Sequence, residues 1–136
     1  MLQALGIVGT VLAAGALVAS AVSYVRLARM GHLTSDYLRR RGWIDGWLLA
    51  VWGLLLAGSV GLLTGATWAG TVLRVWTGLL AAWTLWYTFA NLYTLRGLAP
   101  EVPVRWGSVI AGYAVVWLLV GGLTLGVHVL LGQAGL

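Results

Sequence analysis

The sequence lacks two side chains that carry much of protein chemistry, because its 136 residues include no cysteine and no lysine. Without cysteine there can be no disulfide bond, thiolate chemistry or cysteine-ligated iron–sulfur cluster. Without lysine there can be no Schiff base to a carbonyl compound such as retinal. All eight basic residues are therefore arginines.

Charge of either sign is scarce. Charged residues make up 8% of the chain and hydrophobic residues 61%, and only three residues are acidic. A soluble domain carries about 25% charged residues. This chain has too few to cover a surface that faces water, so lipid or protein must surround most of it. The net charge of +5 does not indicate nucleic acid, because the arginines lie beside long apolar runs.

The few charges are concentrated in two short stretches, from Arg26 to Asp45 and from Arg96 to Arg105, and only Arg74 stands apart. About 20 helical residues cross the ~30 Å hydrocarbon core of a membrane. Lipid offers no partner to free backbone groups, so each apolar run must be a helix. We therefore predict an all-α membrane protein with four transmembrane helices in an antiparallel up-down bundle. The predicted spans of this single domain, residues 1–136, are 5–27, 44–63, 71–95 and 104–131.

The two ends of the predicted third connection are marked by Pro100 and Pro103, which break a helix between residues 98 and 103. The N-terminal run superficially resembles a signal peptide, with Ala19-Ser20-Ala21 as a cleavage-like sequence. It has no basic region before it and is longer than the usual apolar core of a signal. We expect it to be retained as the first span.

The arginines also predict orientation. Arg39, Arg40 and Arg41 fall in the first predicted connection, and Arg96 and Arg105 in the third. The positive-inside rule places both connections in the cytoplasm, so both termini are predicted to lie outside it. The same arginines could bind anionic lipid headgroups or an acidic partner. The composition favours a prokaryotic protein of the cell (inner) membrane.

The halves of the chain share a weak pattern. Val51-Trp52 is followed by Gly61, and Val116-Trp117 is followed by Gly126 at the same spacing. A duplicated helical hairpin explains the pattern, and chance between two Leu/Gly/Val-rich runs is the alternative.

Small residues recur every four positions on the second predicted span and again on the fourth. This spacing puts them on one helix face, where backbones can approach closely. The face either packs within this chain or docks another subunit. The candidate residues are Gly53, Ala57, Gly61, Gly65, Gly122 and Gly126.

Aromatic residues and histidine are the remaining candidates for ligand binding. Trp43, Trp47, Trp68 and Trp106 fall near predicted membrane surfaces, and Trp83, Trp86, Tyr87, Phe89 and Tyr93 give the third span an aromatic surface. His128 is a weak candidate ligand for a pigment. His32 lies near the opposite membrane surface, so the two histidines cannot share a metal or a haem. Asp45 is expected to cap the second helix or to pair with Arg41.

No catalytic triad, phosphate-binding loop or metal-ligand spacing occurs. We therefore expect a non-catalytic accessory or scaffolding subunit of a larger membrane complex, such as a respiratory or other energy-converting assembly. Its expected partners are membrane lipids and other integral membrane subunits, with bound lipid as the only expected ligand. One alternative is a small oligomeric channel or transporter, although no acidic residue lies deep in a span. The other is a pigment-, quinone- or lipid-binding subunit.

Overall fold

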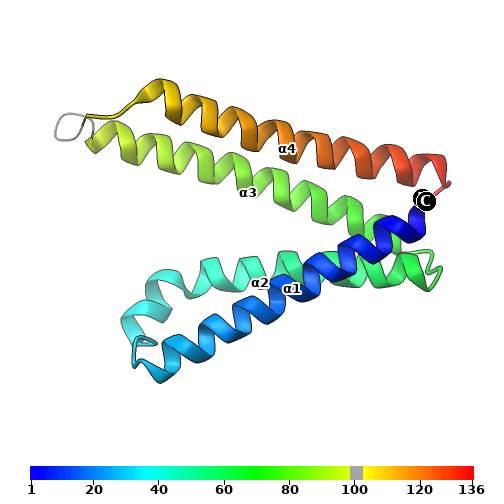
Figure 1. Ribbon diagram of the computed structural model, residues 1–136, viewed down its shortest axis with the longest axis horizontal. Coiled ribbons are helices and arrows are strands. Elements are labelled where there is room, and N and C mark those ends of the chain that lie inside the picture. Colours follow the sequence, from blue (N-terminus) through cyan, green and yellow to red (C-terminus); the bar gives the residue numbers. More distant parts are fainter. Residues whose placement is uncertain (99–102) are drawn as a thin grey trace.

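A computed structural model describes residues 1–98 and 103–136. These residues form four long helices, which confirms the all-α prediction (Figure 1). The helices are α1 (Leu2–Arg29), α2 (Ser35–Leu63), α3 (Ala69–Leu98) and α4 (Trp106–Gln133). The predicted helix break at Pro100 lies outside the described residues.

Three of the helices, α1, α2 and α4, are long and apolar enough to cross a membrane. The chain is therefore a membrane protein. Helix α3 has 30 residues, which is sufficient length. Its tryptophans, tyrosines, threonines and Arg74 leave it without a stretch as apolar as those in the other three helices. Its crossing remains a prediction.

Helix α2 begins at Ser35, well before the predicted start of the second span at residue 44. The hydroxyl of Thr34 caps this helix by accepting a hydrogen bond of 3.2 Å from the main-chain nitrogen of Tyr37. Of the two roles predicted for Asp45, a cap or a pair with Arg41, the cap is therefore wrong, because Asp45 lies well inside the helix. Its carboxylate accepts a hydrogen bond of 3.2 Å from the Tyr37 phenol.

The early start of α2 also changes the place of the arginines. Arg39, Arg40 and Arg41 lie on the first two turns of a helix, and not in a connecting loop as predicted. The loop between α1 and α2 is only the short segment 30–34. The three guanidinium groups are therefore fixed to a rigid element.

A glycine with a left-handed backbone follows the end of α2. Gly65 has a φ of 72°, which costs a residue with a side chain about 1 kcal/mol or more. The main-chain nitrogen of Ala66 donates a hydrogen bond of 2.8 Å to the carbonyl oxygen of Gly61, as in a Schellman cap. Gly65 thus terminates the helix.

The four helices form two antiparallel hairpins, α1 with α2 and α3 with α4 (Figure 1). Extensive contacts join α1 to α2, α2 to α3, and α3 to α4. The hairpins converge at the end that holds the α2–α3 turn and the C-terminus, and they diverge toward the other end. Consecutive helices thus run up and down, but a closed bundle and an internal duplication are not confirmed.

Close glycine contacts hold the converged end together. A Cβ added to Gly9 of α1 would overlap the Ser59 hydroxyl of α2 and lie 3.1 Å from its Cβ. A Cβ added to Gly58 would lie 2.7 Å from Leu73 Cγ, where α2 meets α3. The core around these contacts includes Leu55, Leu62, Leu73, Trp76, Val127 and Leu131.

Candidate functional site

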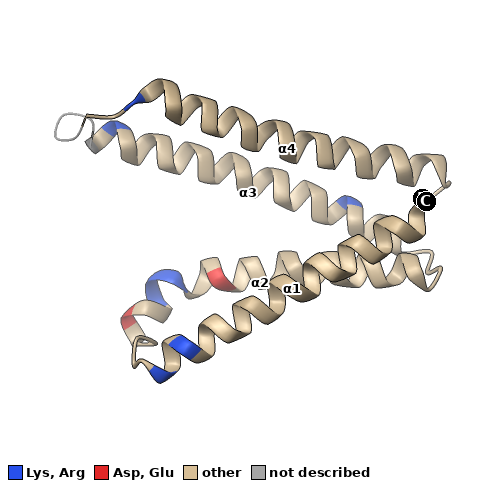
Figure 2. Cartoon of the chain, in the orientation of Figure 1, with Lys and Arg blue, Asp and Glu red and all other residues tan. Residues whose placement is uncertain are grey.

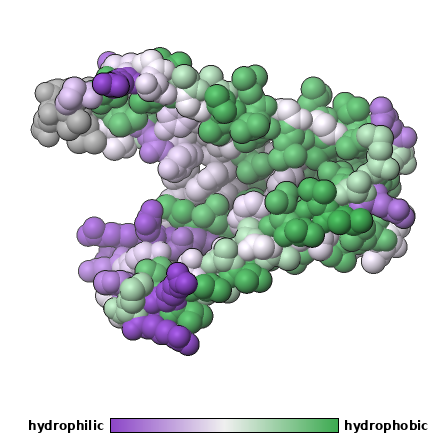
Figure 3. Space-filling model, viewed as in Figure 1, coloured by the Kyte–Doolittle hydropathy of each residue, from purple (hydrophilic) through white to green (hydrophobic). Residues whose placement is uncertain are grey.

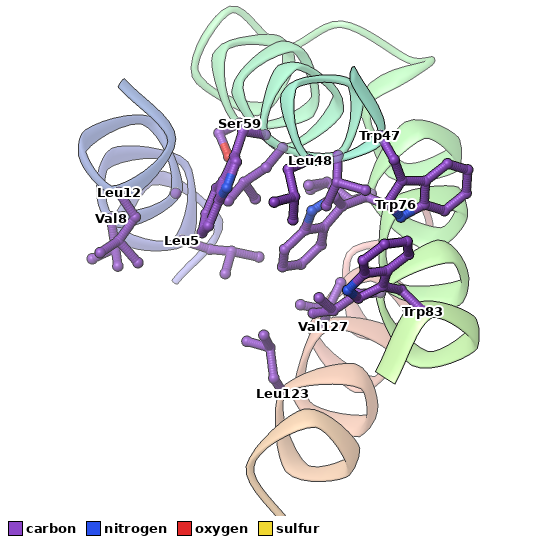
Figure 4. A pocket seen from close by; sticks show the side chains of 16 residues that line it. Leu5, Val8, Leu12, Trp47, Leu48, Ser59, Trp76, Trp83, Leu123 and Val127 are labelled. Carbon is purple, nitrogen blue, oxygen red and sulfur yellow. The ribbon is translucent and has the colours of Figure 1, made fainter. Parts of the chain in front are cut away.

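A cavity of about 230 Å³ lies between the two hairpins (Figure 4). We call it the central cavity. All four helices contribute to its wall, so it exists only where the hairpins face each other. Its lining includes Leu5 and Leu12 from α1, Val51 and Leu55 from α2, Leu73 and Leu80 from α3, and Leu123 and Val127 from α4.

The central cavity is almost entirely apolar. Its few polar groups are the Ser59 hydroxyl and the indole nitrogens of tryptophans. Within the described part of the chain, the buried Nε1 atoms of Trp47 and Trp76 have no hydrogen-bond partner. An unpaired buried donor costs about 1–3 kcal/mol. This wall suits an apolar chain and excludes a free charge.

Four tryptophans, Trp43 and Trp47 of α2 with Trp83 and Trp86 of α3, form a cluster across the interface between these helices. Their ring centroids are 5.0–6.0 Å apart, and Trp47 stacks on Trp83 at an interplanar angle of 23°. Trp47 and Trp83 also line the central cavity, on the same side as Trp76 (Figure 4). The tryptophan cluster therefore bounds the cavity on the side of the diverging helix ends.

This cluster was only partly predictable. The spacing of Trp43 and Trp47, and of Trp83 and Trp86, places each pair on one helix face. We expected the first pair at the membrane surface and the second on an aromatic face of the third span. Their meeting depends on the register between α2 and α3, which the sequence does not reveal.

Arginines gather at the diverging end of the molecule (Figure 2). Arg39, Arg40 and Arg41 lie near the start of α2, Arg96 lies in the last turn of α3, and Arg105 directly precedes α4. All five are exposed. The space-filling view shows an open notch between the hairpins at this end, with hydrophilic residues beside it (Figure 3). The tryptophan cluster joins α2 and α3 at the inner end of this notch.

Arg74 lies near the opposite, converged end. Its guanidinium donates a hydrogen bond of 2.5 Å to the main-chain oxygen of Leu136. A Cβ added to Gly70, one turn earlier on α3, would lie 2.9 Å from Leu136 Cβ. The isolated arginine thus has a structural partner that connects α3 to the segment after α4.

The two histidines lie at different ends of the structure. His128 is exposed near the end of α4, and its Nδ1 lies 2.9 Å from the carbonyl oxygen of Thr124 on the same helix. His32 is in the loop after α1. The described residues contain no group of three side chains able to hold a metal ion. Pigment ligation by His128 remains a prediction.

The predicted small-residue face divides into different environments. A Cβ added to Gly61 would lie 2.9 Å from both Ala69 Cβ and Trp68 Cη2, so Gly61 packs closely on the start of α3. At Gly53, Gly122 and Gly126, no atom of residues 1–98 or 103–136 lies within 4 Å of an added Cβ, and Ala57 is exposed. Their role as a docking face remains a prediction.

Sequence reasoning missed the small residues that join α1 to α2. Gly6, Gly9 and Ala13 are the buried residues of α1. Their spacing of three and four places them on one face, which is the same signal that we applied to the second span. The signal was therefore present in the first span as well.

No protein-family model, curated protein or solved structure matches this chain. No residue role can therefore be transferred from a relative. The central cavity, the tryptophan cluster and the arginine-flanked notch are the features from which function must be argued.

Proposed function

We propose that the protein is a non-catalytic membrane subunit that holds a lipid-like molecule between its two hairpins. The central cavity is the observation that carries this proposal. It is bounded by four helices, three of which are apolar enough to cross a bilayer, and its wall is almost wholly apolar. A lipid tail is the molecule that such a wall accommodates without leaving a charge unpaired.

The energetics of this binding differ from those in water. A tail that moves from the bilayer into the cavity gains little hydrophobic free energy, because lipid is as apolar as leucine. The gain comes from dispersion contacts that the cavity walls lack when the cavity is empty. Fixed indole rings next to the cavity can provide many such contacts at low entropic cost.

We further propose that the diverging end faces the cytoplasm. Helix α3 packs against both α2 and α4, which are apolar enough to cross the membrane, so it lies at the same depth as they do. With seven of the eight arginines at the diverging end, the positive-inside rule places that end in the cytoplasm of a prokaryotic cell and both termini outside.

A second proposal is a role as an accessory subunit in a larger membrane complex. The open space beside Gly53, Gly122 and Gly126 supports it, because no atom of the described residues lies within 4 Å of a Cβ added at these positions. Unlike subunits should then co-purify with the protein in fixed ratio from mild detergent. If the protein purifies without other subunits but with bound lipid, only the lipid-binding proposal stands.

Filling the central cavity tests the main proposal. Leu123→Trp places a large ring at the cavity wall, and Leu119→Trp, one turn away on α4, is the matched control because Leu119 is 69% exposed and lies outside the lining. We expect protein extracted in mild detergent to retain lipid, as measured by mass spectrometry. Leu123→Trp should lower this amount and Leu119→Trp should not. Equal retention by both variants would contradict the proposal.

A further inference from the structure

The notch and the central cavity lie one after the other along the same pair of helices. Arg41 precedes Trp47 by six residues on α2, which corresponds to about 9 Å along the helix. The cavity wall then extends along α2 from Trp47 to Ser59, or about 18 Å. One leaflet of hydrocarbon is about 15 Å thick. A molecule with its head in the notch could therefore extend one acyl chain along the cavity.

The borders of the notch are cationic on both sides. Arg39, Arg40 and Arg41 lie on α2, and Arg96 lies on α3, the two helices that meet at the tryptophan cluster. The described acidic residues at this end are Asp36 and Asp45, and the Asp45 carboxylate accepts a hydrogen bond from Tyr37. The helix ends beside the notch thus carry an excess of guanidinium groups, which bind phosphate through paired hydrogen bonds.

We propose that the notch and the central cavity together bind an anionic phospholipid. Its phosphate lies among the arginines of α2 and α3, and one acyl chain passes the tryptophan cluster into the cavity. This inference rests on the proposed lipid-binding function and adds the class of headgroup. The tail alone gains little over the surrounding bilayer, so selectivity must come from the charged head.

The expected size of the selectivity follows from surface electrostatics. Each arginine near an anionic headgroup contributes about fivefold to binding, and two contribute about 30-fold at low ionic strength. Salt should weaken the preference, because exposed charges are screened beyond about 10 Å at 0.1 M. A preference that comes from tail packing would not depend on salt in this way.

The experiment uses the full chain in nanodiscs that contain equal amounts of phosphatidylglycerol and phosphatidylcholine. After gentle release, native mass spectrometry counts each lipid retained by the protein. We expect phosphatidylglycerol to be favoured in the wild type. Arg40→Gln/Arg41→Gln should lower that preference by about 30-fold. Arg40→Lys/Arg41→Lys, which keeps the charge, should preserve most of it and controls for folding.

The matched control is Arg26→Gln/Arg29→Gln. It removes the same charge from the same end of the molecule, but on α1, whereas the tryptophan cluster at the inner end of the notch joins α2 and α3. We expect the control to change the preference less than fivefold. Equal losses from the two pairs would overturn the proposal, since the lipid would then respond only to the overall charge of this end.

The cavity variant separates this inference from the proposed function. Leu123→Trp should lower retention of both lipids, whereas the Arg40/Arg41 pair should change only their ratio. Equal retention of both lipids by the wild type would overturn the headgroup assignment and leave the cavity proposal standing. Displacement of phosphatidylglycerol by an equimolar prenyl phosphate would overturn the phospholipid as the occupant. Unchanged retention in Leu123→Trp would overturn the cavity as the site of the tail.

Discussion

Replacing Gly9 with alanine tests whether α1 is held against α2 by close backbone approach. Gly9 is buried and faces Ser59 across the hairpin. An added methyl group would overlap the Ser59 hydroxyl and would lie 3.1 Å from Ser59 Cβ and 3.6 Å from Leu55 Cδ1. The hydroxyl can rotate, but the Ser59 Cβ is fixed by the backbone. Ser59 is 1% exposed, so the helices must separate slightly to admit the methyl group.

The size of the effect combines two opposing contributions. Adding a methylene-sized group to a packed core typically costs about 1–3 kcal/mol. Alanine in place of glycine favours a helix by about 0.5–1 kcal/mol. We therefore expect Gly9→Ala to lower the free energy of unfolding by about 1 kcal/mol, and by no more than about 2.5 kcal/mol, relative to the wild type.

Gly15→Ala is the matched control on the same helix. Gly15 is exposed, and no atom lies within 4 Å of its added Cβ. This variant gains helix propensity without a clash, so its free energy of unfolding should equal or exceed that of the wild type. The two variants should thus differ by about 1–3 kcal/mol.

Unfolding by sodium dodecyl sulfate in mild-detergent micelles, followed by tryptophan fluorescence, measures this difference. Gly9→Ala should unfold at a lower mole fraction of sodium dodecyl sulfate than Gly15→Ala. Adding Ser59→Gly to Gly9→Ala removes the opposing side chain and should recover at least half of the loss, as in a double-mutant cycle. Coincident curves for the two alanine variants would refute the close contact. If Gly9→Ala/Ser59→Gly is no more stable than Gly9→Ala, the loss of stability does not come from the contact with Ser59.

Three further outcomes follow from the same structure. Gly61→Leu should destabilise the protein by about 1–3 kcal/mol in the same unfolding assay, because the larger side chain pushes α2 away from the start of α3. Gly53→Leu, the control, should not destabilise it. If both variants are as stable as the wild type, Gly61 faces lipid. Trp83→Leu should lower the free energy of unfolding by about 1–3 kcal/mol, because it removes ring contacts with three other tryptophans. An unchanged unfolding curve would show that the tryptophan cluster does not stabilise the fold. A reporter that is active only outside the cytoplasm should be active when fused after Leu136, and activity of a cytoplasmic reporter at that position would reverse the orientation.

The helices were largely predictable from the uncharged runs. The spans expected at 5–27 and 104–131 correspond to α1 (Leu2–Arg29) and α4 (Trp106–Gln133). Helix α2 starts at Ser35, before the span predicted from residue 44, and this difference has a simple cause. Charged residues end a membrane span, but a helix can continue into water until a capping residue begins it, here Thr34.

The inward faces of the helices were harder to predict. Helices α1, α2 and α4 are apolar around most of their circumference, so no amphipathic period distinguishes a protein-facing side from a lipid-facing side. Ala57 and Gly58 are neighbours of similar size, yet Ala57 is exposed and Gly58 packs against Leu73. Small residues at regular spacing therefore predicted that close contacts exist, but not which residues make them. The central cavity was not predicted either, because it depends on how the two hairpins face each other.

Helix α3 shows why composition alone does not decide how this chain sits in a membrane. It lacks a stretch as apolar as those in the other three helices, but its polar groups are largely satisfied within the protein. The Thr84 and Thr88 hydroxyls donate to carbonyl oxygens one turn earlier at 2.8 and 2.7 Å, and Thr88 also accepts a hydrogen bond of 3.2 Å from the Trp117 indole of α4. Extensive contacts with α2 and α4 cover two of its sides. A helix that packs against two neighbours can therefore carry threonine and tryptophan on its covered sides, where lipid would offer them no partner. Among the side chains that lower its hydropathy, Trp83 and Trp86 form part of the tryptophan cluster, and Thr88 connects α3 to α4.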